Sequence, residues 1–195
     1  DGIWLQVDEQ NQAAIRLYLQ EGFVEQTRRT TWYLEPDNLL PGRGNSGNPG
    51  WQVHSRTARH WGRQRRWLKR TYPAQVRWHL PLKLSTLRGG ILGMLARVFS
   101  VDPDIQQWSV SNRDDLVGVI SWQSSKRHSD WMWMATSPGK EGMVLDAFFS
   151  RGSERVPFPR RVRLDYPAEQ AGDPLRRVGF RSSRTLIWMR HNDQD

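Results

Sequence analysis

The side chains with obvious chemistry in this sequence are histidines, serines, tyrosines and many arginines, and their spacing excludes several kinds of site. The chain of 195 residues has no cysteine, which excludes a disulfide scaffold, a thiolate metal site and a cysteine nucleophile. No Ser, His and acidic residue form a recognisable nucleophile set, and G-x-S-x-G is absent. The five histidines are scattered without the paired spacing of a zinc site: His54, His60, His79, His128 and His191. We therefore expect no metal.

The positive charge is concentrated in one third of the chain. The net charge is +9, from 29 Lys+Arg and 20 Asp+Glu. Residues 39–100 contain 12 basic residues and no acidic one. Because Trp61, Trp67 and Trp78 are interleaved with the arginines, this basic segment could grip phosphates and stack bases. A solvated helical face, or a surface that attracts an acidic ligand, explains the same pattern, and no RNA- or DNA-binding signature accompanies it.

The first 50 residues predict a strand, a helix, a strand and then a linker. Apolar residues alternate over 3–7, as in a strand. Asn11 is a suitable N-cap for a helix that Gly22 ends, and strand formers fill 23–34. Residues 36–50 are rich in proline and glycine, which predicts a boundary between domains.

The remaining residues predict a packed unit with an aromatic core, since the chain has 11 tryptophans. We predict a basic helix over 54–70, and either a helix or a bent strand over 80–99. Three antiparallel strands follow at 105–110, 116–122 and 130–135. A helix over 141–150, a strand over 162–166, a weak helix containing Pro174 and a strand over 180–189 complete the prediction.

The two ends of the chain contain a repeat. Residues 3–34 line up with residues 162–189. Both copies predict a strand, a polar turn, Gln-Ala, a short helix, Gly-Phe, an Arg-rich turn and an aromatic strand. The Gly-Phe pair after the helix, Gly22-Phe23 in one copy and Gly179-Phe180 in the other, argues against coincidence.

The first copy resembles a known family. Leu5-Gln6-Val7, Asn11, Ala13-Ala14-Ile15, Leu17-Tyr18 and Gly22-Phe23 resemble the late motif of the GNAT superfamily of N-acetyltransferases, a strand followed by N-x-x-A-x-x-L-Y-x-x-x-G-F. The resemblance implies an α/β (α+β) acyl-CoA N-acyltransferase fold, with a mixed, mostly antiparallel central sheet flanked by helices. It also implies a tandem arrangement. Residues 1–35 would be the last third of a first GNAT domain, 36–50 a linker, and 51–195 a second, near-complete but degenerate GNAT domain.

The chemistry that this resemblance implies is transfer of an acetyl group from acetyl-CoA to an amine. Tyr18 stands where the family has a tyrosine that protonates the departing thiolate. At the equivalent place before Gly179 stands Leu175, which cannot donate a proton. Tyr18 is equally explained as packing, and Asn11, a candidate cofactor contact, as a plain N-cap.

Acetyl-CoA would lie between two splayed strands, with its pyrophosphate on the first N–H groups of the helix 141–150. The turn SPGKEG, residues 137–142, keeps only the last position of the family's phosphate loop, and Glu141 adds a negative charge there. Gly139 and Gly142 could simply form a turn and a helix start. The implied cofactor-binding residues in this part of the chain are Met134, Ala135, Thr136, Gly139, Lys140 and Gly142.

We therefore expect a cytoplasmic N-acetyltransferase with acetyl-CoA and an amine as its substrates. No apolar run approaches the ~20 residues needed to cross a bilayer. Because the chain starts at Asp1 and the first domain would lack its early strands, we expect this chain to be inactive alone, with the missing part of its own first domain as a partner. The alternative is a non-catalytic GNAT-fold module that binds RNA or an acidic partner through the basic segment.

Overall fold

The computed structural model describes residues 2–38, 50–88, 104–126, 128–151 and 160–192. These residues form eight strands, which are β1 Gly2–Asp8, β2 Val24–Leu34, β3 Trp51–Ser55, β4 Ile105–Asn112, β5 Asp115–Gln123, β6 Asp130–Thr136, β7 Val162–Pro167 and β8 Arg181–Asn192. The helices are α1 Gln12–Gln20, α2 Trp61–Thr71, α3 Ala74–Arg77, α5 Glu141–Arg151 and α6 Gly172–Arg177, with 3-10 turns at Pro36–Asn38 and Ala58–His60.

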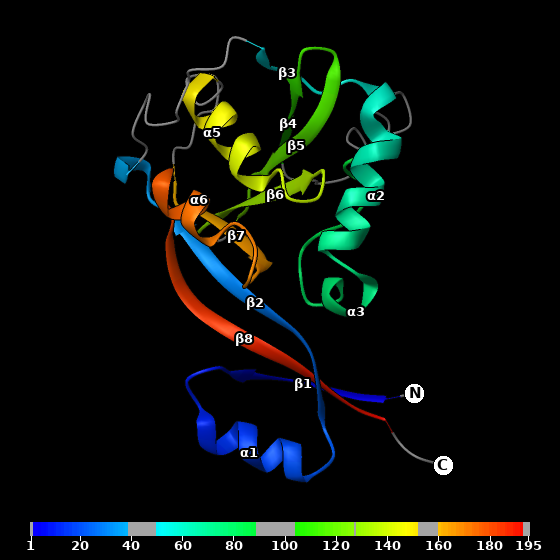
Figure 1. Ribbon diagram of the computed structural model, residues 1–195, viewed down its shortest axis with the longest axis vertical. Helices are drawn as coiled ribbons and strands as arrows, with labels where there is room; N and C mark the ends of the chain where they lie inside the picture. The colour runs from blue at the N-terminus through cyan, green and yellow to red at the C-terminus, as the bar shows by residue number, and fades with distance from the viewer. Residues whose placement is uncertain (1, 39–49, 89–103, 127, 152–159, 193–195) are drawn as a thin grey trace.

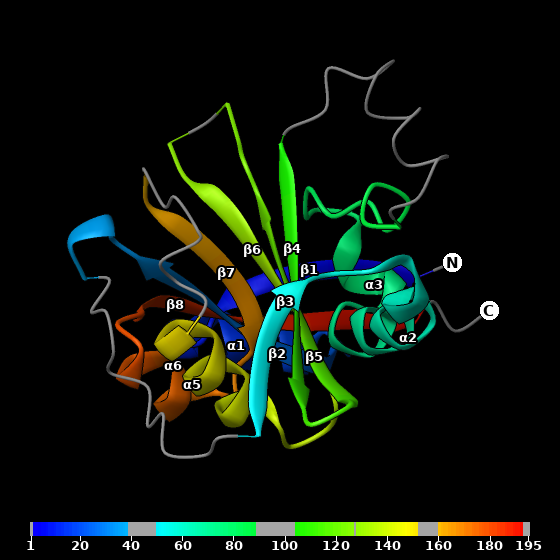
Figure 2. The ribbon, with the colours of Figure 1, turned by 90° about the horizontal axis from the view of Figure 1, so that it is seen from above.

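All eight strands belong to one sheet, in the order β1-β8-β2-β7-β6-β5-β4-β3. Every neighbouring pair is antiparallel except β6 and β7, which run parallel. Figures 1 and 2 show α5 and α6 on one face of the sheet and α2 and α3 on the other. The mixed, mostly antiparallel sheet flanked by helices that the resemblance implied is therefore confirmed.

The core lies between the sheet and the helices on both faces. On one face α5 buries the four apolar residues that the helical spacing predicted, Val144, Leu145, Phe148 and Phe149. On the other face α2 and the residues after it bury Leu68, Tyr72 and Val76, among others. Several tryptophans are almost fully buried, including Trp32, Trp133 and Trp188. The aromatic core that the composition predicted is present.

The prediction of one basic helix over 54–70 is wrong at its start. Residues Trp51–Ser55 form β3, the edge strand that pairs with β4, and α2 begins only at Trp61. Val53 is buried in the main core, and β4 supplies backbone partners that a helix would not use. Tertiary pairing thus overrides a weak local pattern here. Residues 80–88 of the segment predicted as a helix or a bent strand form turns and bends instead. Its residues 89–99, like residues 39–49 of the predicted linker, lie outside the described residues.

The other predicted elements are confirmed within a few residues of their ends. The strands predicted at 105–110, 116–122 and 130–135 are β4, β5 and β6, and they form the expected antiparallel meander. Pro174 lies in the first turn of α6, where its missing N–H costs nothing. Among the described residues no helix is long and apolar enough to span a membrane.

The repeat in the sequence is a pseudo-twofold repeat in the structure. β8 lies between β1 and β2 of the first copy, and β2 lies between β7 and β8 of the second. The register is symmetric, since the pair Val24–Arg190 at one end of the β2–β8 ladder corresponds to Tyr33–Arg181 at the other. The two bulges in this ladder, at Gln26 and at the equivalent Ser183, also correspond. Each copy therefore inserts its last strand into the other.

The helices of the two copies end in the same way. Gly22 and Gly179 both have positive φ, 83° and 101°. Phe23 N–H donates to the Tyr18 carbonyl and Phe180 N–H to the Leu175 carbonyl, both at 2.9 Å. These glycines take the left-handed conformation that favours glycine after a helix. The Gly-Phe pair in the sequence thus reports a shared helix C-terminus.

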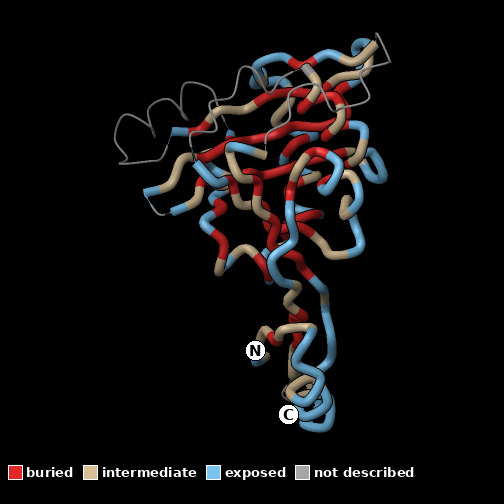
Figure 3. Tube along the Cα trace, turned by 90° about the vertical axis from the view of Figure 1, so that its left-hand side faces the viewer, coloured by how far each residue is buried: buried red, intermediate tan, exposed pale blue. Residues whose placement is uncertain are grey.

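The first copy carries little core of its own. A small cluster of Val7, Ile187 and Met189 packs against Leu5, Ala14, Ile15, Tyr18 and Phe23, and α1 has no buried residue. Figure 1 shows the long strands β2 and β8 running from the main body to this part, and Figure 3 shows that its helix is mostly exposed. The surface of β1 and α1 that points away from β8 is open in the described structure.

Candidate functional site

The parallel strands β6 and β7 diverge from one another inside the sheet. In the described structure they pair at only two positions, Asp130 with Val162 and Trp131 with Arg163. Both strands continue for four or more residues beyond these pairs. The facing edges of the continuing segments have no strand partner within the described structure. Side chains bond some of their peptide groups, since Arg29 donates to the Asp165 carbonyl at 3.2 Å and Arg70 donates to the Thr136 carbonyl.

We call the place where β6 and β7 diverge the splay. The three residues predicted at the end of β6, Met134, Ala135 and Thr136, are buried along its β6 edge. The Thr136 hydroxyl donates to the Glu141 carboxylate at 3.1 Å. Its carbonyl accepts a hydrogen bond of 2.7 Å from the Arg70 guanidinium. The end of β6 is therefore held between α5 on one face and α2 on the other.

The turn after β6 leads directly into α5. Gly139 has φ of +69°, a conformation that favours glycine, and the space around it is open. Lys140 is exposed, and its N–H closes the turn on the Ser137 carbonyl at 3.1 Å. A Cβ on Gly142 would lie 3.1 Å from Pro174 Cγ of α6, so glycine permits the close approach of the two helices. Lys140 thus immediately precedes the first N–H groups of α5, in the turn that follows the end of β6.

Glu141 does not present its charge at this turn. Its side chain is buried, and its carboxylate accepts the hydrogen bond from Thr136. The sequence suggested that Glu141 would oppose a phosphate at the start of α5. The structure instead turns the carboxylate into the protein, which leaves Lys140 as the charged side chain exposed at residues 137–142.

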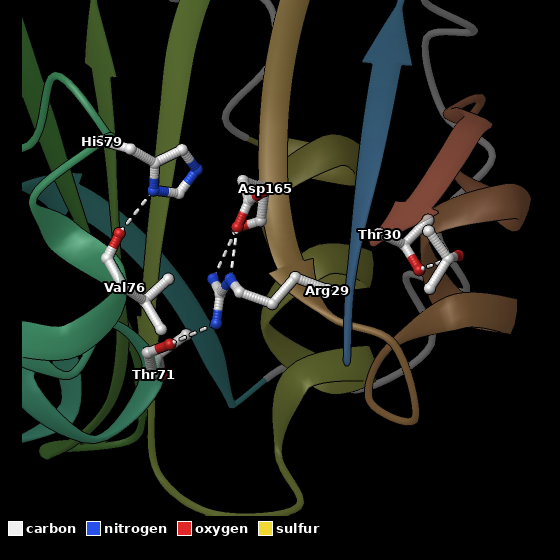
Figure 4. A network of polar contacts seen from close by, with 7 residues as sticks. Arg29, Thr30, Thr71, Val76, His79 and Asp165 are labelled. Atoms are coloured by element: carbon white, nitrogen blue, oxygen red, sulfur yellow. Dashed lines mark hydrogen bonds and ion pairs between the residues drawn. The ribbon is translucent and has the colours of Figure 1, made fainter. Parts of the chain in front are cut away.

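A buried ion pair lies near the splay, on the sheet face that α2 and α3 cover. The Arg29 guanidinium on β2 donates to the Asp165 carboxylate on β7, and both side chains are almost fully buried. Arg29 also donates to the Thr71 carbonyl at the end of α2, at 2.8 Å. Figure 4 shows Arg29 between Asp165 and Thr71, with His79 opposite Asp165. This network joins both repeat copies to α2.

Two buried tyrosines flank the ion pair. Tyr72 packs edge-on against Trp133, with ring centroids 5.6 Å apart, and the Arg29 guanidinium lies 5.1 Å from its ring centre. Burial raises the pKa of Tyr72 well above its usual range. Burial, with the negative Glu141 nearby, raises the pKa of Tyr166 to about 12. Both phenols are therefore neutral at ordinary pH and can donate a hydrogen bond or a proton only as hydroxyls.

The two site residues predicted in the first copy lie elsewhere. Asn11 caps α1, since its side chain accepts a hydrogen bond of 3.1 Å from the Ala14 N–H. Tyr18 packs edge-on against Phe23, with centroids 5.7 Å apart. Four positions of the sheet order separate β1 from β6, and Figure 1 shows α1 far from α5. The structure thus brings together the residues predicted at 134–142 but places Asn11 and Tyr18 apart from them.

Comparison with known proteins shows which solved structures this chain is similar to. No protein-family model matches the sequence, and no curated protein does. Among solved structures, a GCN5-related N-acetyltransferase from Kribbella flavida is 14% identical with a TM-score of 0.59, over 99% of this chain and 69% of that one. A GCN5-related N-acetyltransferase from Sphaerobacter thermophilus is 15% identical with a TM-score of 0.53, over 97% and 59%. A tandem GNAT protein from the clavulanic acid biosynthesis pathway is 12% identical with a TM-score of 0.55, over 100% and 65%.

The chain has the GNAT fold. The likeness extends over nearly the whole chain, including β1 and α1, and so confirms the fold that the resemblance of residues 5–23 implied. The chain spans between 59% and 69% of the lengths of these three proteins. Within the GNAT fold of this chain, the splay between β6 and β7 and the start of α5 form one continuous candidate site.

The polar residues near the splay on the α2 and α3 face of the sheet were not predicted from the sequence. Arg29, Asp165, Tyr72 and His79 were not singled out, although each lies on the α2 and α3 side of the GNAT sheet. One signal was present, because Asp165 interrupts the apolar strand VRLDYP. A carboxylate inside a buried strand needs a partner, and that partner is 136 residues away in sequence. Among the described residues, no group of three His, Asp or Glu side chains could hold a metal ion.

Proposed function

We propose that this protein transfers an acetyl group from acetyl-CoA to an amine at the splay between β6 and β7. Both strands lie within residues 51–195, so this activity, unlike one that depends on Tyr18, would not need the rest of a first GNAT domain. The observation that carries the proposal is the divergence of two parallel strands immediately before the N-terminus of an eleven-residue helix, within a GNAT fold. The edges of β6 and β7 beyond their two pairs lack a strand partner in the described structure, and such edges suit the amide groups of the pantetheine arm. The substrate's pyrophosphate suits the first N–H groups of α5.

The residues at this site fit acetyl-CoA in part. Met134, Ala135 and Thr136 would supply backbone groups, and Gly139, Lys140 and Gly142 would form the phosphate turn. In support, Lys140 is exposed, and Gly139 lacks a side chain where the turn is open. Because only Gly142 matches the family's loop pattern, Lys140 would carry more of the phosphate binding here than in a complete loop.

Calorimetric titration with acetyl-CoA tests this site. We expect binding by the wild-type chain and at least a roughly 10-fold weaker affinity for Lys140→Ala, because a charge-assisted contact contributes about 1.5 kcal/mol or more. Gly139→Val should also weaken binding, since the substitution strains the turn without filling a contact. Lys126→Ala, at an exposed position on the β5–β6 connection, is the matched control. Absence of binding by the wild-type chain would overturn the proposal.

We further propose that residues 1–35 are the last third of a first GNAT-fold unit, with Tyr18 as its proton donor. The repeat supports this, because the surface of the second copy that β6 and α5 cover has an exposed counterpart in the first. Val162 is buried beside β6, whereas the equivalent Ile3 is 56% exposed. Pro174 lies against Gly142 of α5, whereas the equivalent Leu17 is 52% exposed. A strand parallel to β1, followed by a helix over α1, would cover both.

Hydrogen exchange separates this second proposal from the first. We expect the amides of β1 to exchange faster in this chain alone than in the full-length product of its gene. Acetyl-CoA affinity, measured on both proteins, reports the site on β6 and α5 independently. Equal exchange of the β1 amides in the two proteins would contradict the missing-strand proposal and leave the acetyl-CoA proposal standing.

A non-catalytic module is the second candidate, and a specific observation favours it. Leu175, in the place that Tyr18 has in the first copy, is fully buried and has no group to donate a proton. The exposed face of α2 carries five basic residues, Arg63, Arg65, Arg66, Lys69 and Arg70. Binding of a 20-nucleotide poly(U) RNA that weakens steeply with salt, together with no turnover of acetyl-CoA, would favour this candidate.

A further inference from the structure

His79 is held with one ring nitrogen free of its proton. The residue follows α3 and is half-buried on the sheet face that α2 and α3 cover. Its Nδ1 lies 2.7 Å from the Val76 carbonyl oxygen. A carbonyl oxygen can only accept, so Nδ1 must carry the hydrogen, and Nε2 of the neutral ring keeps its lone pair. The backbone thus fixes the tautomer.

The ring lies at the splay. It packs against Trp188 of β8, with ring centroids 4.5 Å apart, and Trp78 packs edge-on against both rings. Figure 4 shows the imidazole opposite Asp165 of β7. Asp165 lies two residues beyond the last position at which β7 pairs with β6. His79 therefore faces the point where the strands begin to diverge, from the side opposite α5.

Burial is the main reason why the His79 ring is neutral. Burial lowers the pKa of His79 below its usual value of 6.5, and the cationic Arg29 and Arg163 act in the same direction. The carboxylate of Asp165 opposes them, together with the Val76 hydrogen bond. Burial outweighs these two opposing effects, so the pKa of the imidazole stays below its usual value. Near pH 7 the ring is therefore able to accept a proton.

We propose that His79 is the base that takes a proton from the acceptor amine, an inference that rests on the proposed acetyl transfer. The amine nitrogen attacks the thioester carbonyl carbon, the C–N bond forms and the C–S bond breaks. The sulfur leaves with the electron pair as a thiolate, which solvent protonates. Nε2 of His79 takes the proton that the nitrogen loses and later returns it to water. His79 thus approaches from the α3 side and acetyl-CoA from the α5 side.

Release of the CoA thiol tests the assignment directly, because a chain without cysteine gives no background with a thiol reagent. With acetyl-CoA and either benzylamine or spermidine, we expect His79→Gln to lower kcat about 100-fold or more, with little change in KM for acetyl-CoA. Added imidazole should restore part of the rate of His79→Ala. His54→Gln, at an exposed histidine of β3, is the matched control and should retain activity. A kcat for His79→Gln equal to wild type would overturn the proposal.

Nitrogen NMR of the histidine side chains provides a readout that needs no turnover. We expect His79, assigned by the loss of its signals in His79→Gln, to be neutral and protonated at Nδ1 at pH 7. Adding acetyl-CoA should shift its Nε2 signal and leave that of His54 unchanged. A proton on Nε2, or an unchanged His79 signal in the presence of bound acetyl-CoA, would contradict the role of His79. Absence of any acetyl-CoA binding would instead contradict the proposed function from which that role follows.

Discussion

Arg29 of β2 and Leu186 of β8 face each other on the axis that relates the two repeat copies. They pair in the ladder between the strands, and each is the counterpart of the other in the repeat. Their environments nevertheless differ, because Arg29 meets Asp165 on β7, whereas the residue equivalent to Asp165 on β1 is Gln6. The symmetric backbone therefore holds one charged network, on the side of the candidate site.

The Arg29 network should be important for stability. Arg29→Met would leave the carboxylate of Asp165 buried without its partner, which we expect to lower the free energy of unfolding by about 3 to 5 kcal/mol. Arg28→Met is a matched control, because Arg28 pairs with Glu25 on the surface, and its loss should cost less than about 1 kcal/mol. Urea denaturation of both variants measures the difference. Equal losses of unfolding free energy would show that the buried pair contributes no more to stability than the exposed pair of Arg28 and Glu25.

The hydroxyl pair next to the axis provides a second test. Thr30 Oγ1 lies 2.9 Å from Thr185 Oγ1. Thr30→Val should lower stability by about 1 to 2 kcal/mol, because the remaining hydroxyl loses its partner. Thr30→Val combined with Thr185→Val should lose less than the sum of the two single variants. Additive losses in thermal or urea unfolding would mean that the two hydroxyls do not interact.

Two glycines should respond in opposite ways to alanine. A Cβ on Gly118 of β5 would lie 2.6 Å from Val144 Cγ2 of α5, and a valine side chain has little freedom to move away. We expect Gly118→Ala to destabilise the protein by about 1 to 3 kcal/mol. Gly62 in α2 has nothing within 4 Å of the same position, so Gly62→Ala should stabilise by about 0.5 to 1 kcal/mol. Melting temperatures that shift in the same direction would refute this packing.

The stability should fall as the pH is lowered from 7.5 to 5.5. Burial lowers the pKa values of His79 and His60 in the folded protein, and Arg59, Arg56 and Arg63 add to the effect at His60. The unfolded chain, with ordinary histidines of pKa about 6.5, then binds protons more readily than the folded one as the pH falls. The stabilisation is present above pH about 6.5 and is lost below it. Urea denaturation across this range should show that the free energy of unfolding depends less on pH in His79→Gln than in wild type. An unchanged dependence on pH would exclude His79 from the effect.

The sequence predicted the strands of the central meander, whose partners are local. In the meander from β4 to β6 each strand pairs with the next, and alternating apolar residues predict each strand separately. The edge strand β3 was missed because its pairing with β4 crosses more than 50 residues of chain. A five-residue segment with one buried side chain has too weak a pattern to predict without that partner.

The candidate site was predicted only in part for the same reason. Residues 134–142 are consecutive, so the strand, turn and helix that place Thr136 beside Glu141 could be expected from the motif. Asp165, Arg29 and His79 come from three distant segments, and no local pattern relates them. The separation of Tyr18 from this site likewise depends on where β1 lies in the sheet.

By itself, the sequence determined the repeat, the helix ends at Gly22 and Gly179, the aromatic core and the family that the chain resembles. Glycine conformation, capping and side-chain periodicity are properties of short segments, and they act before the chain is folded. Only the tertiary structure decided that each copy inserts its last strand into the other, which places Arg29 against Asp165 and His79 at the splay. This insertion depends on backbone hydrogen bonds between segments 148 to 166 residues apart, and those bonds leave no mark on the sequence of either segment alone.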